Sequence, residues 1–98
     1  MDTIIFLCTG NTCRSPMAEG LFRAHNGEEK TGLTAASAGL YTENGLLASA
    51  NAVAAAGERG ADISAHRSRQ LTAEMAENAK YLVCMTGAHY DRLCELFP

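Results

Sequence analysis

The chain has 98 residues and a formal charge of −3 at neutral pH, and its Lys and Arg residues form no run. This length suits one domain over residues 1–98, because two independent domains would have too little surface to bury. Nucleic acids and membrane surfaces are bound through concentrated positive charge, so the composition argues against both as partners.

The chain opens with the pattern of a strand followed by a helix. Thr3–Cys8 is an apolar run typical of a strand buried on both faces, and it is too short for a signal peptide or membrane span, so a cytosolic protein is expected. Ser15 followed by Pro16 is an N-cap and first-turn pattern, which predicts a helix ending near Asn26. The residues expected to face inward are Ala18, Leu21, Phe22 and His25.

A second strand and a small-residue helix follow. Residues 33–37, closed by Gly39, predict a strand parallel to the first, since a strand–helix–strand order gives a right-handed crossover. Residues 50–59 predict a helix that ends at Gly60. The inward face expected of this helix consists of Ala50, Val53, Ala54 and Gly57.

The last third of the chain predicts a polar connection, a short helix, a strand and a final helix. The connection spans residues 62–69, and Thr72 is placed to cap a helix over residues 73–78. Residues 81–85 predict a third buried strand, and residues 86–97 predict the last helix. Its expected apolar face consists of Tyr90, Leu93, Cys94 and Phe97. Alternating strands and helices predict the α/β class, as a three-layer sandwich around a central parallel sheet.

The segment between the first strand and the first helix carries Cys8 and Arg14, separated by five residues. In a strand–turn–helix context, successive backbone N–H groups point into the turn, beside the positive end of the helix dipole. Gly10 permits close backbone approach, and Asn11 tolerates a positive φ. The segment therefore predicts a cradle for a tetrahedral dianion. Its expected phosphate-binding residues are Thr9, Gly10, Asn11, Thr12, Cys13, Arg14 and Ser15.

Cys8 and Arg14 are the expected catalytic pair. The field of the cradle favours an anion at Cys8, which predicts a thiolate nucleophile at neutral pH. Arg14 offers planar, bidentate donors to a phosphoryl group, and Ser15 is expected both to cap the helix and to donate a hydrogen bond to the thiolate. A buried thiol and a surface arginine also occur at this spacing by chance, but the flanking strand, turn and cap residues favour the catalytic interpretation.

Residues 4–20, with the sequence Ile-Ile-Phe-Leu-Cys-Thr-Gly-Asn-Thr-Cys-Arg-Ser-Pro-Met-Ala-Glu-Gly, resemble the signature of the low-molecular-weight protein-tyrosine phosphatase family. Residues 37–39 and 63–71 resemble two further motifs of that family, so the likeness spans essentially the whole chain. The resemblance implies a phosphocysteine intermediate at Cys8 that water hydrolyses. It also implies a phosphorylated protein as substrate and inorganic phosphate as product and inhibitor.

The resemblance implies further roles that the residues alone do not suggest. It implies a hydrogen-bonded network that holds the loop, formed by Asn11, Ser15, Ser37 and His66. By ordinary burial habits, Ser37 would be a strand-end hydroxyl and His66 a solvated loop imidazole. Cys13 matches a cysteine that can pair with the nucleophile in the family and shield it from over-oxidation.

The chain departs from the family at its C-terminal side. Family members continue with a further strand, a helix and an Asp-Pro loop whose aspartate protonates the leaving group, and no general acid is found here. Asp91 is the only late aspartate, and its helical context predicts an exposed position. The fold is therefore expected to be truncated at this edge, leaving a sheet edge open to self-association or to a partner.

Several activities fit such a site. Tyrosine phosphatase is the family default, and a protein-arginine phosphatase is the alternative, because members of that kind carry Thr at the position of Thr12. Tyr41 is either a wall of the substrate cleft or an ordinary exposed loop residue. Arsenate reduction would need two downstream cysteines, for which only Cys84 and Cys94 are available, and both are expected to be buried structural thiols. A phosphate-binding interaction module is the alternative that is not an enzyme.

No metal or cofactor is expected. The four cysteines are interpreted as thiols, since the chain has neither an export signal nor the cysteine density of a small secreted scaffold. Zinc is poorly supported, because the gap between Cys8 and Cys13 is one residue too long for a paired-ligand knuckle and no His lies near at ligand spacing.

Overall fold

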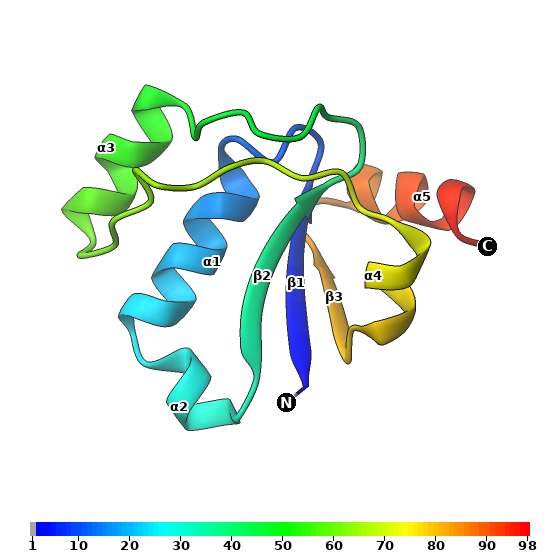
Figure 1. Cartoon of the computed structure of the whole chain (residues 1–98), viewed down its shortest axis with the longest axis horizontal. Helices are drawn as coiled ribbons and strands as arrows, with labels where there is room; N and C mark the ends of the chain where they lie inside the picture. The colour runs from blue at the N-terminus through cyan, green and yellow to red at the C-terminus, as the bar shows by residue number, and fades with distance from the viewer. Residues whose placement is uncertain (1) are drawn as a thin grey trace.

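A computed structural model describes residues 2–98 and contains a three-stranded parallel sheet in the order β2-β1-β3 (Figure 1). The strands are β1 (Thr3–Cys8), β2 (Thr34–Gly39) and β3 (Tyr81–Cys84). In the register, Cys8 lies opposite Gly39, and Leu7 lies opposite Cys84. The carboxyl ends of all three strands therefore meet at one edge of the sheet.

Helices cover both faces of the sheet, which confirms the predicted α/β sandwich (Figure 1). The helices are α1 (Arg14–Ala24), α2 (Gly27–Thr31), α3 (Ala50–Glu58), α4 (Ala73–Asn78) and α5 (Gly87–Leu96). One face is covered by α1, which also packs against α3, and the other face is covered by α4 and α5. Within residues 2–98, no helix is long and apolar enough to cross a membrane.

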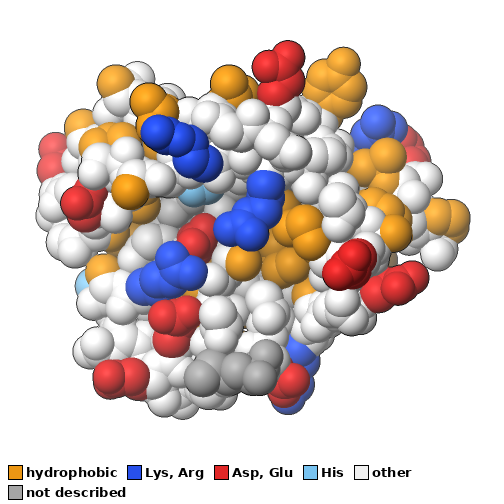
Figure 2. All heavy atoms as spheres, in the orientation of Figure 1, with side chains coloured by type: hydrophobic (Ala, Val, Ile, Leu, Met, Phe, Trp, Pro, Cys, Tyr) orange, Lys and Arg blue, Asp and Glu red, His pale blue; other side chains and the backbone are white. Residues whose placement is uncertain are grey.

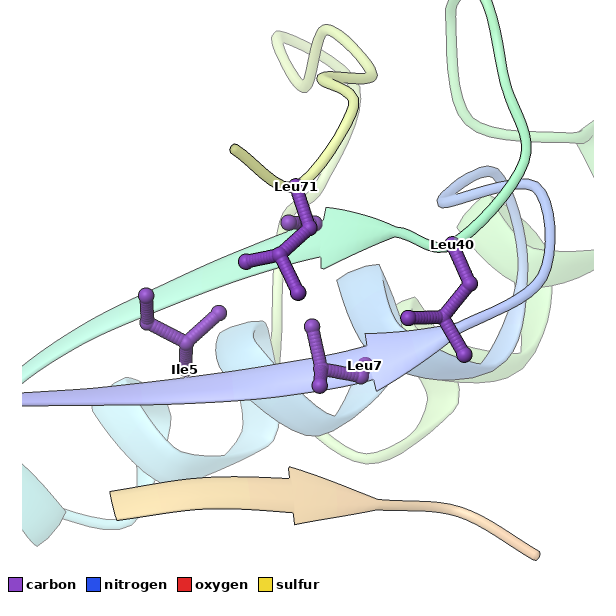
Figure 3. Close-up of a cluster of buried hydrophobic side chains, with 5 residues drawn as sticks. Ile5, Leu7, Leu40 and Leu71 are labelled. Atoms are coloured by element: carbon purple, nitrogen blue, oxygen red, sulfur yellow. The ribbon is translucent and has the colours of Figure 1, made fainter. Parts of the chain in front are cut away.

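The larger core lies between the sheet and the layer of α4 and α5. Ile5 and Leu7 point to this face because successive side chains of a strand alternate, and they meet Leu40 and Leu71 (Figure 3). Partly buried side chains of α4, α5 and the residues that follow them pack against this core on the side away from the sheet. They are Met75, Ala76, Ala79, Leu93, Leu96 and Phe97. This core holds in place the end of β1 from which the loop departs.

The buried side of α1 differs in part from the predicted one. The predicted Ala18, Leu21 and Phe22 are half-buried and His25 is exposed, whereas the fully buried residues are Ser15, Pro16 and Glu19. The polar residues can be buried because they find hydrogen-bond partners across the interface, which apolar spacing alone does not reveal. The helix also ends at Ala24, and Asn26 takes a left-handed conformation (φ 63°) that starts the unpredicted short helix α2.

The predicted inward faces of the later elements are also partly wrong. In α3 the buried residues are Ala52 and Ala56, which pack against α1, and of the predicted face only Val53 packs against this cluster. In α5 the predicted Leu93 and Phe97 pack against the larger core, but the buried residue is His89, and Tyr90 and Cys94 are exposed. Strand β3 was expected to be buried, but it lies at the sheet edge, so its residues are exposed or half-buried. The cap predicted at Thr72 is confirmed, because its hydroxyl accepts a hydrogen bond at the start of α4. Thr86 was predicted to lie within the last helix, but it caps α5 in the same way.

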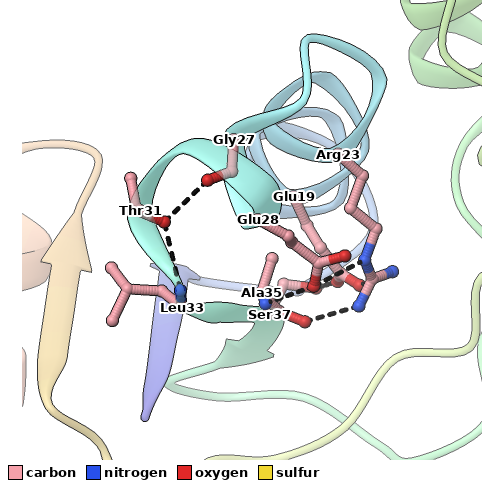
Figure 4. A network of polar contacts seen from close by, with 8 residues as sticks. All are labelled: Glu19, Arg23, Gly27, Glu28, Thr31, Leu33, Ala35 and Ser37. Carbon is pink, nitrogen blue, oxygen red and sulfur yellow. Dashed lines mark hydrogen bonds and ion pairs between the residues drawn. The ribbon is translucent and has the colours of Figure 1, made fainter. Parts of the chain in front are cut away.

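A polar network joins α1, α2 and the outer edge of β2 (Figure 4). Glu28 accepts a hydrogen bond from the Ala35 backbone N–H, and Arg23 donates to the Ala35 carbonyl. Arg23 also forms an ion pair with Glu19 at 2.6 Å. The backbone groups of an edge strand are open to pairing with another chain, so these side chains close the β2 edge at Ala35.

Candidate active site

The loop of residues 9–13 leaves the carboxyl end of β1 and leads directly into α1. It lies close to the neighbouring strand, because a Cβ atom on Gly39 would lie 2.8 Å from the Thr9 carbonyl oxygen. Gly39 therefore allows the loop to approach β2. At Gly10 a Cβ atom would meet only the Thr12 hydroxyl within the chain, at 3.6 Å, so the expected close approach there concerns the bound anion and stays a prediction.

The backbone of the loop is oriented with its carbonyl groups outward. The carbonyl oxygens of Cys8, Thr9 and Thr12 accept hydrogen bonds from the N–H groups of Leu40 (2.9 Å), Tyr41 (3.0 Å) and Ser49 (2.7 Å). By contrast, the N–H groups of residues 10–14 donate no hydrogen bond to any group among residues 2–98. Unpaired N–H groups at a helix N-terminus form a binding site for an anion.

The Cys8 sulfur lies at the base of this cradle, and the residue is 4 % exposed. Its Sγ atom is 2.9 Å from the Ser15 hydroxyl and 3.4 Å from the Ser15 backbone nitrogen. The prediction that Ser15 caps the helix is wrong: the N-cap is Cys13, and Ser15 lies within the first turn, which turns its hydroxyl toward the sulfur. This hydroxyl can donate to a thiolate, the role expected of it.

Asn11 links the loop to the segment of residues 66–69. It is fully buried and has a φ of 55°, the only non-glycine residue with positive φ besides Asn26 among residues 2–98. Its side chain donates to the Ser15 hydroxyl (2.8 Å) and accepts from the Arg69 backbone N–H (2.9 Å). Its carbonyl oxygen lies 2.8 Å from Nε2 of His66. The structure therefore brings Asn11, Ser15 and His66 together.

Ser37 does not join this network. It is fully buried, but its hydroxyl donates to Glu19 at 2.6 Å, so it connects β2 to α1 below the loop. The predicted direct support of the loop by Ser37 is therefore replaced by a contact within the polar network around Arg23 (Figure 4).

Two cavities adjoin the loop. One, of about 490 Å³, is lined by Thr9, Arg14, Leu40, Tyr41, Thr86, Ala88, His89 and Arg92. The other, of about 610 Å³, includes Gly10, Thr12, Tyr41 and Glu43 in its lining. Tyr41 lines both cavities and is exposed, and its role as a wall of the substrate cleft stays a prediction.

Arg14 is exposed, and its guanidinium has no hydrogen-bond or ion-pair partner in the described part of the chain.

A third cavity, of about 600 Å³, lies away from Cys8 between α1 and residues 60–69. Figure 2 shows basic side chains around this hollow on the visible face, and those that line it are Arg23, Arg67 and Arg69.

His89 is the residue at this site that sequence reasoning missed. The apolar spacing on the same helix predicted an inward face that includes Tyr90 and Cys94 and leaves out His89. A signal was nevertheless present: Thr86 caps α5 by accepting from the His89 backbone N–H (3.2 Å), which places His89 in the first turn beside the loop. Burial, and after it the positive charge of Arg14, lower the pKa of His89.

The remaining cysteines and Asp91 lie outside the loop cavities. Burial, followed by the neighbouring Cys94, raises the pKa of Cys84, whereas Cys94 itself is exposed and so differs from the expected buried thiol. Cys13 is exposed and unpaired. Asp91 is exposed on α5 and lines neither cavity beside the loop.

Comparison with known proteins agrees with this geometry. The profile of the family described as "Low molecular weight phosphotyrosine protein phosphatase" matches residues 3–98. A protein-arginine-phosphatase of Geobacillus stearothermophilus is 41 % identical over 95 residues, covering 97 % of this chain and 62 % of its own length. A probable low molecular weight protein-tyrosine-phosphatase, EpsP of Ralstonia nicotianae, is 36 % identical over 98 residues, covering 100 % of this chain and 65 % of its own.

A similar solved structure is that of a YwlE mutant from Bacillus subtilis. It superimposes with a TM-score of 0.90 at 37 % identity, covering 99 % of this chain and 65 % of its own length. The chain therefore spans less than two thirds of the length of each of these relatives.

Proposed function

The chain belongs to the low-molecular-weight phosphotyrosine protein phosphatase family, and on that premise we propose that it removes phosphate from phosphorylated proteins through a phosphocysteine at Cys8. The observation that carries the proposal is the set of unpaired N–H groups of residues 10–14 around the Cys8 sulfur. A phosphoryl group seated there would have its equatorial oxygens held by these donors and by Arg14.

The proposed reaction has two displacements. In the first, the Cys8 thiolate attacks phosphorus, so that an S–P bond forms as the bond to the leaving group breaks. In the second, water attacks phosphorus, the S–P bond breaks and inorganic phosphate leaves. The Ser15 hydroxyl, 2.9 Å from Sγ, stabilises the thiolate as it departs. Inorganic phosphate would bind the same donors and therefore inhibit.

No residue among residues 2–98 is assigned as the general acid that would protonate the leaving group. Loss of a general acid costs about 10²–10⁴-fold when the leaving group is basic. An aryl phosphate with a weakly basic phenolate avoids this requirement. We therefore choose p-nitrophenyl phosphate as the probe.

The test compares p-nitrophenyl phosphate hydrolysis by the chain, by Cys8→Ser and by Cys94→Ser. The second variant is the matched control, because Cys94 is exposed on α5 and lines neither loop cavity. We expect turnover to be lost only in Cys8→Ser. Phosphate binding without turnover in all three proteins would instead favour the interaction module.

Phosphoarginine is the second candidate substrate. Thr12 lines the cavity beside the loop, where a small polar side chain leaves room for a planar guanidinium and can hydrogen-bond to it. Relatives named protein-arginine-phosphatase in two organisms are 41 % and 39 % identical to this chain. A probable protein-tyrosine-phosphatase, EpsP of Ralstonia solanacearum, is 40 % identical, so identity does not separate the two substrates and Thr12 is the observation that carries the phosphoarginine alternative.

Measuring kcat/KM for phosphoarginine and phosphotyrosine with the wild type and Thr12→Ile separates the two substrates. If Thr12 selects the guanidinium, the variant should shift the ratio toward phosphotyrosine by about tenfold. An unchanged ratio would remove Thr12 from the specificity argument.

Arsenate reduction coupled to thioredoxin is measured in parallel. A relay through the downstream cysteines would be lost in the Cys84→Ser variant.

Location and assembly complete the proposal. We propose a cytosolic protein, supported by the four free cysteines. We also propose self-association through the β3 edge, which pairs with no further strand among residues 2–98.

A further inference from the structure

The cavity of about 490 Å³ beside the loop contains an unusual pair of polar groups, His89 and Arg14. His89 is 5 % exposed, and its Nδ1 atom is buried without a hydrogen-bond partner among residues 2–98. Burying a polar atom without a hydrogen-bond partner is unfavourable, so native structures seldom keep one without a reason. The Arg14 guanidinium beside it also has no partner in the described chain.

The two groups are complementary. A neutral imidazole has one nitrogen that accepts a hydrogen bond, and a guanidinium has five N–H donors, of which a bidentate contact with a phosphoryl group uses two. No carboxylate lines this cavity in residues 2–98, so Arg14 has no competing anionic partner there. Catalytic hydrogen bonds are often open in unliganded sites and close only when substrate binds.

We propose that His89 is a positioning residue, whose unprotonated Nδ1 accepts a hydrogen bond from Arg14 and so orients the guanidinium toward a phosphoryl group bound in the loop. The inference rests on the proposed function only for the phosphoryl group. The contact between His89 and Arg14 does not depend on that function. The capped first turn of α5 supplies the rigidity, because Thr86 fixes the His89 backbone and the parallel register of β1 and β3 places that turn beside the loop.

A pH dependence follows from this role. The titratable or charged groups that line the cavity with His89 are Arg14 of α1, Tyr41 after β2 and Arg92 of the same helix. Burial and Arg14 hold the pKa of His89 below its ordinary value, so the imidazole is neutral at neutral pH. Protonation at lower pH removes the acceptor and places a second cation beside Arg14. The contribution of His89 is therefore present at neutral pH and lost as the pH falls through its lowered pKa.

The test uses His89→Asn, His89→Leu and His25→Leu. Asn places an amide oxygen near the position of Nδ1 but does not titrate, whereas Leu fills the space without an acceptor. His25 is exposed at the end of α1, so its change to Leu is the matched control. The first readout is the affinity for inorganic phosphate by calorimetry, with every variant made on the Cys8→Ser background. Thermal unfolding of each variant shows that it is folded.

We expect His89→Leu to weaken phosphate binding by about tenfold, while His89→Asn and His25→Leu stay within about threefold of the parent. The second readout is kcat/KM for p-nitrophenyl phosphate against pH, divided by the wild-type value so that ionisation of substrate and of Cys8 cancels. This ratio should rise for His89→Asn as the pH falls, because only the wild type acquires the opposing charge.

The proposal would be overturned if folded His89→Leu bound phosphate as tightly as the parent protein. It would also be overturned if His89→Leu and His89→Asn lost phosphate affinity to the same extent. A ratio independent of pH for His89→Asn would do the same. If the wild type shows no turnover, the proposed function fails, and the phosphate affinities still decide the contact between His89 and Arg14.

Discussion

Asn11 holds the loop through its backbone conformation and through both ends of its side-chain amide. Asn26 offers a comparison, because it has a similar φ of 63° but is exposed and makes no capping hydrogen bond with its side chain. An alanine at either position must adopt the left-handed conformation. Only at Asn11 does it also remove the hydrogen bonds to Ser15 and Arg69.

We therefore expect Asn26→Ala to lower the free energy of unfolding by about 1 kcal/mol and Asn11→Ala by about 3 kcal/mol. Urea unfolding at a fixed pH measures both. Equal losses would mean that backbone conformation alone accounts for the preference for asparagine at Asn11. Asn11→Ala should also weaken phosphate binding, an effect absent from Asn26→Ala.

At the scale of single residues, local chemistry was predictable from the residues, whereas tertiary partners were not, and only the family resemblance placed His66 near Asn11. Cys8, Arg14 and Asn11 stand out because their types and spacing are tied to one strand–turn–helix segment. Ser37 and His89 depend on what faces them from other elements. The partner of Ser37, Glu19, lies 18 positions away in the sequence, and no spacing rule connects the two.

Among the elements, the end of β2 is constrained by the loop beside it. A Cβ atom on Gly39 would lie 2.7 Å from Cγ2 of Thr42 and 2.8 Å from the Thr9 carbonyl oxygen. The Thr42 side chain can move, but the backbone oxygen cannot do so without displacing the loop. Gly57 in α3 is the control, because a Cβ atom there would meet nothing within 4 Å.

Gly39→Ala is expected to lower the free energy of unfolding by about 1–3 kcal/mol through overpacking. Gly57→Ala should instead raise it by about 0.5–1 kcal/mol, since alanine favours a helix. Thermal or urea unfolding gives the sign of each change. A Gly39→Ala protein as stable as the wild type, with unchanged phosphate affinity, would show that the loop does not need this close approach.

The existence and order of most elements followed from the sequence, whereas their buried faces followed only in part. The Thr72 cap acts within one turn and was predicted correctly. The face that a short helix buries depends on the elements around it: α3 packs its small residues against α1, and α5 turns Leu93 and Leu96 toward the sheet. In helices of this length, two neighbouring faces fit an apolar repeat about equally well.

At the scale of the whole molecule, the two edges of the sheet differ. The β2 edge is covered at Ala35 by Glu28 and Arg23, and residues 69–71 hydrogen-bond to Gly39 at its end. The β3 edge pairs with nothing in residues 2–98, and Tyr81 on it is 50 % exposed. An open strand edge beside half-buried apolar side chains favours pairing with a second strand.

The sheet therefore predicts self-association that depends on β3, measured by sedimentation equilibrium over a range of protein concentrations. Tyr81→Lys should shift the chain toward monomer, because lysine on an edge strand opposes edge-to-edge pairing. Tyr90→Lys is the matched control, since Tyr90 is 60 % exposed on α5, away from the strand edge. If both variants associate as the wild type does, the contact lies elsewhere. A monomer at every concentration would mean that the half-buried residues of β3 contribute too little apolar area to offset the entropy lost on association.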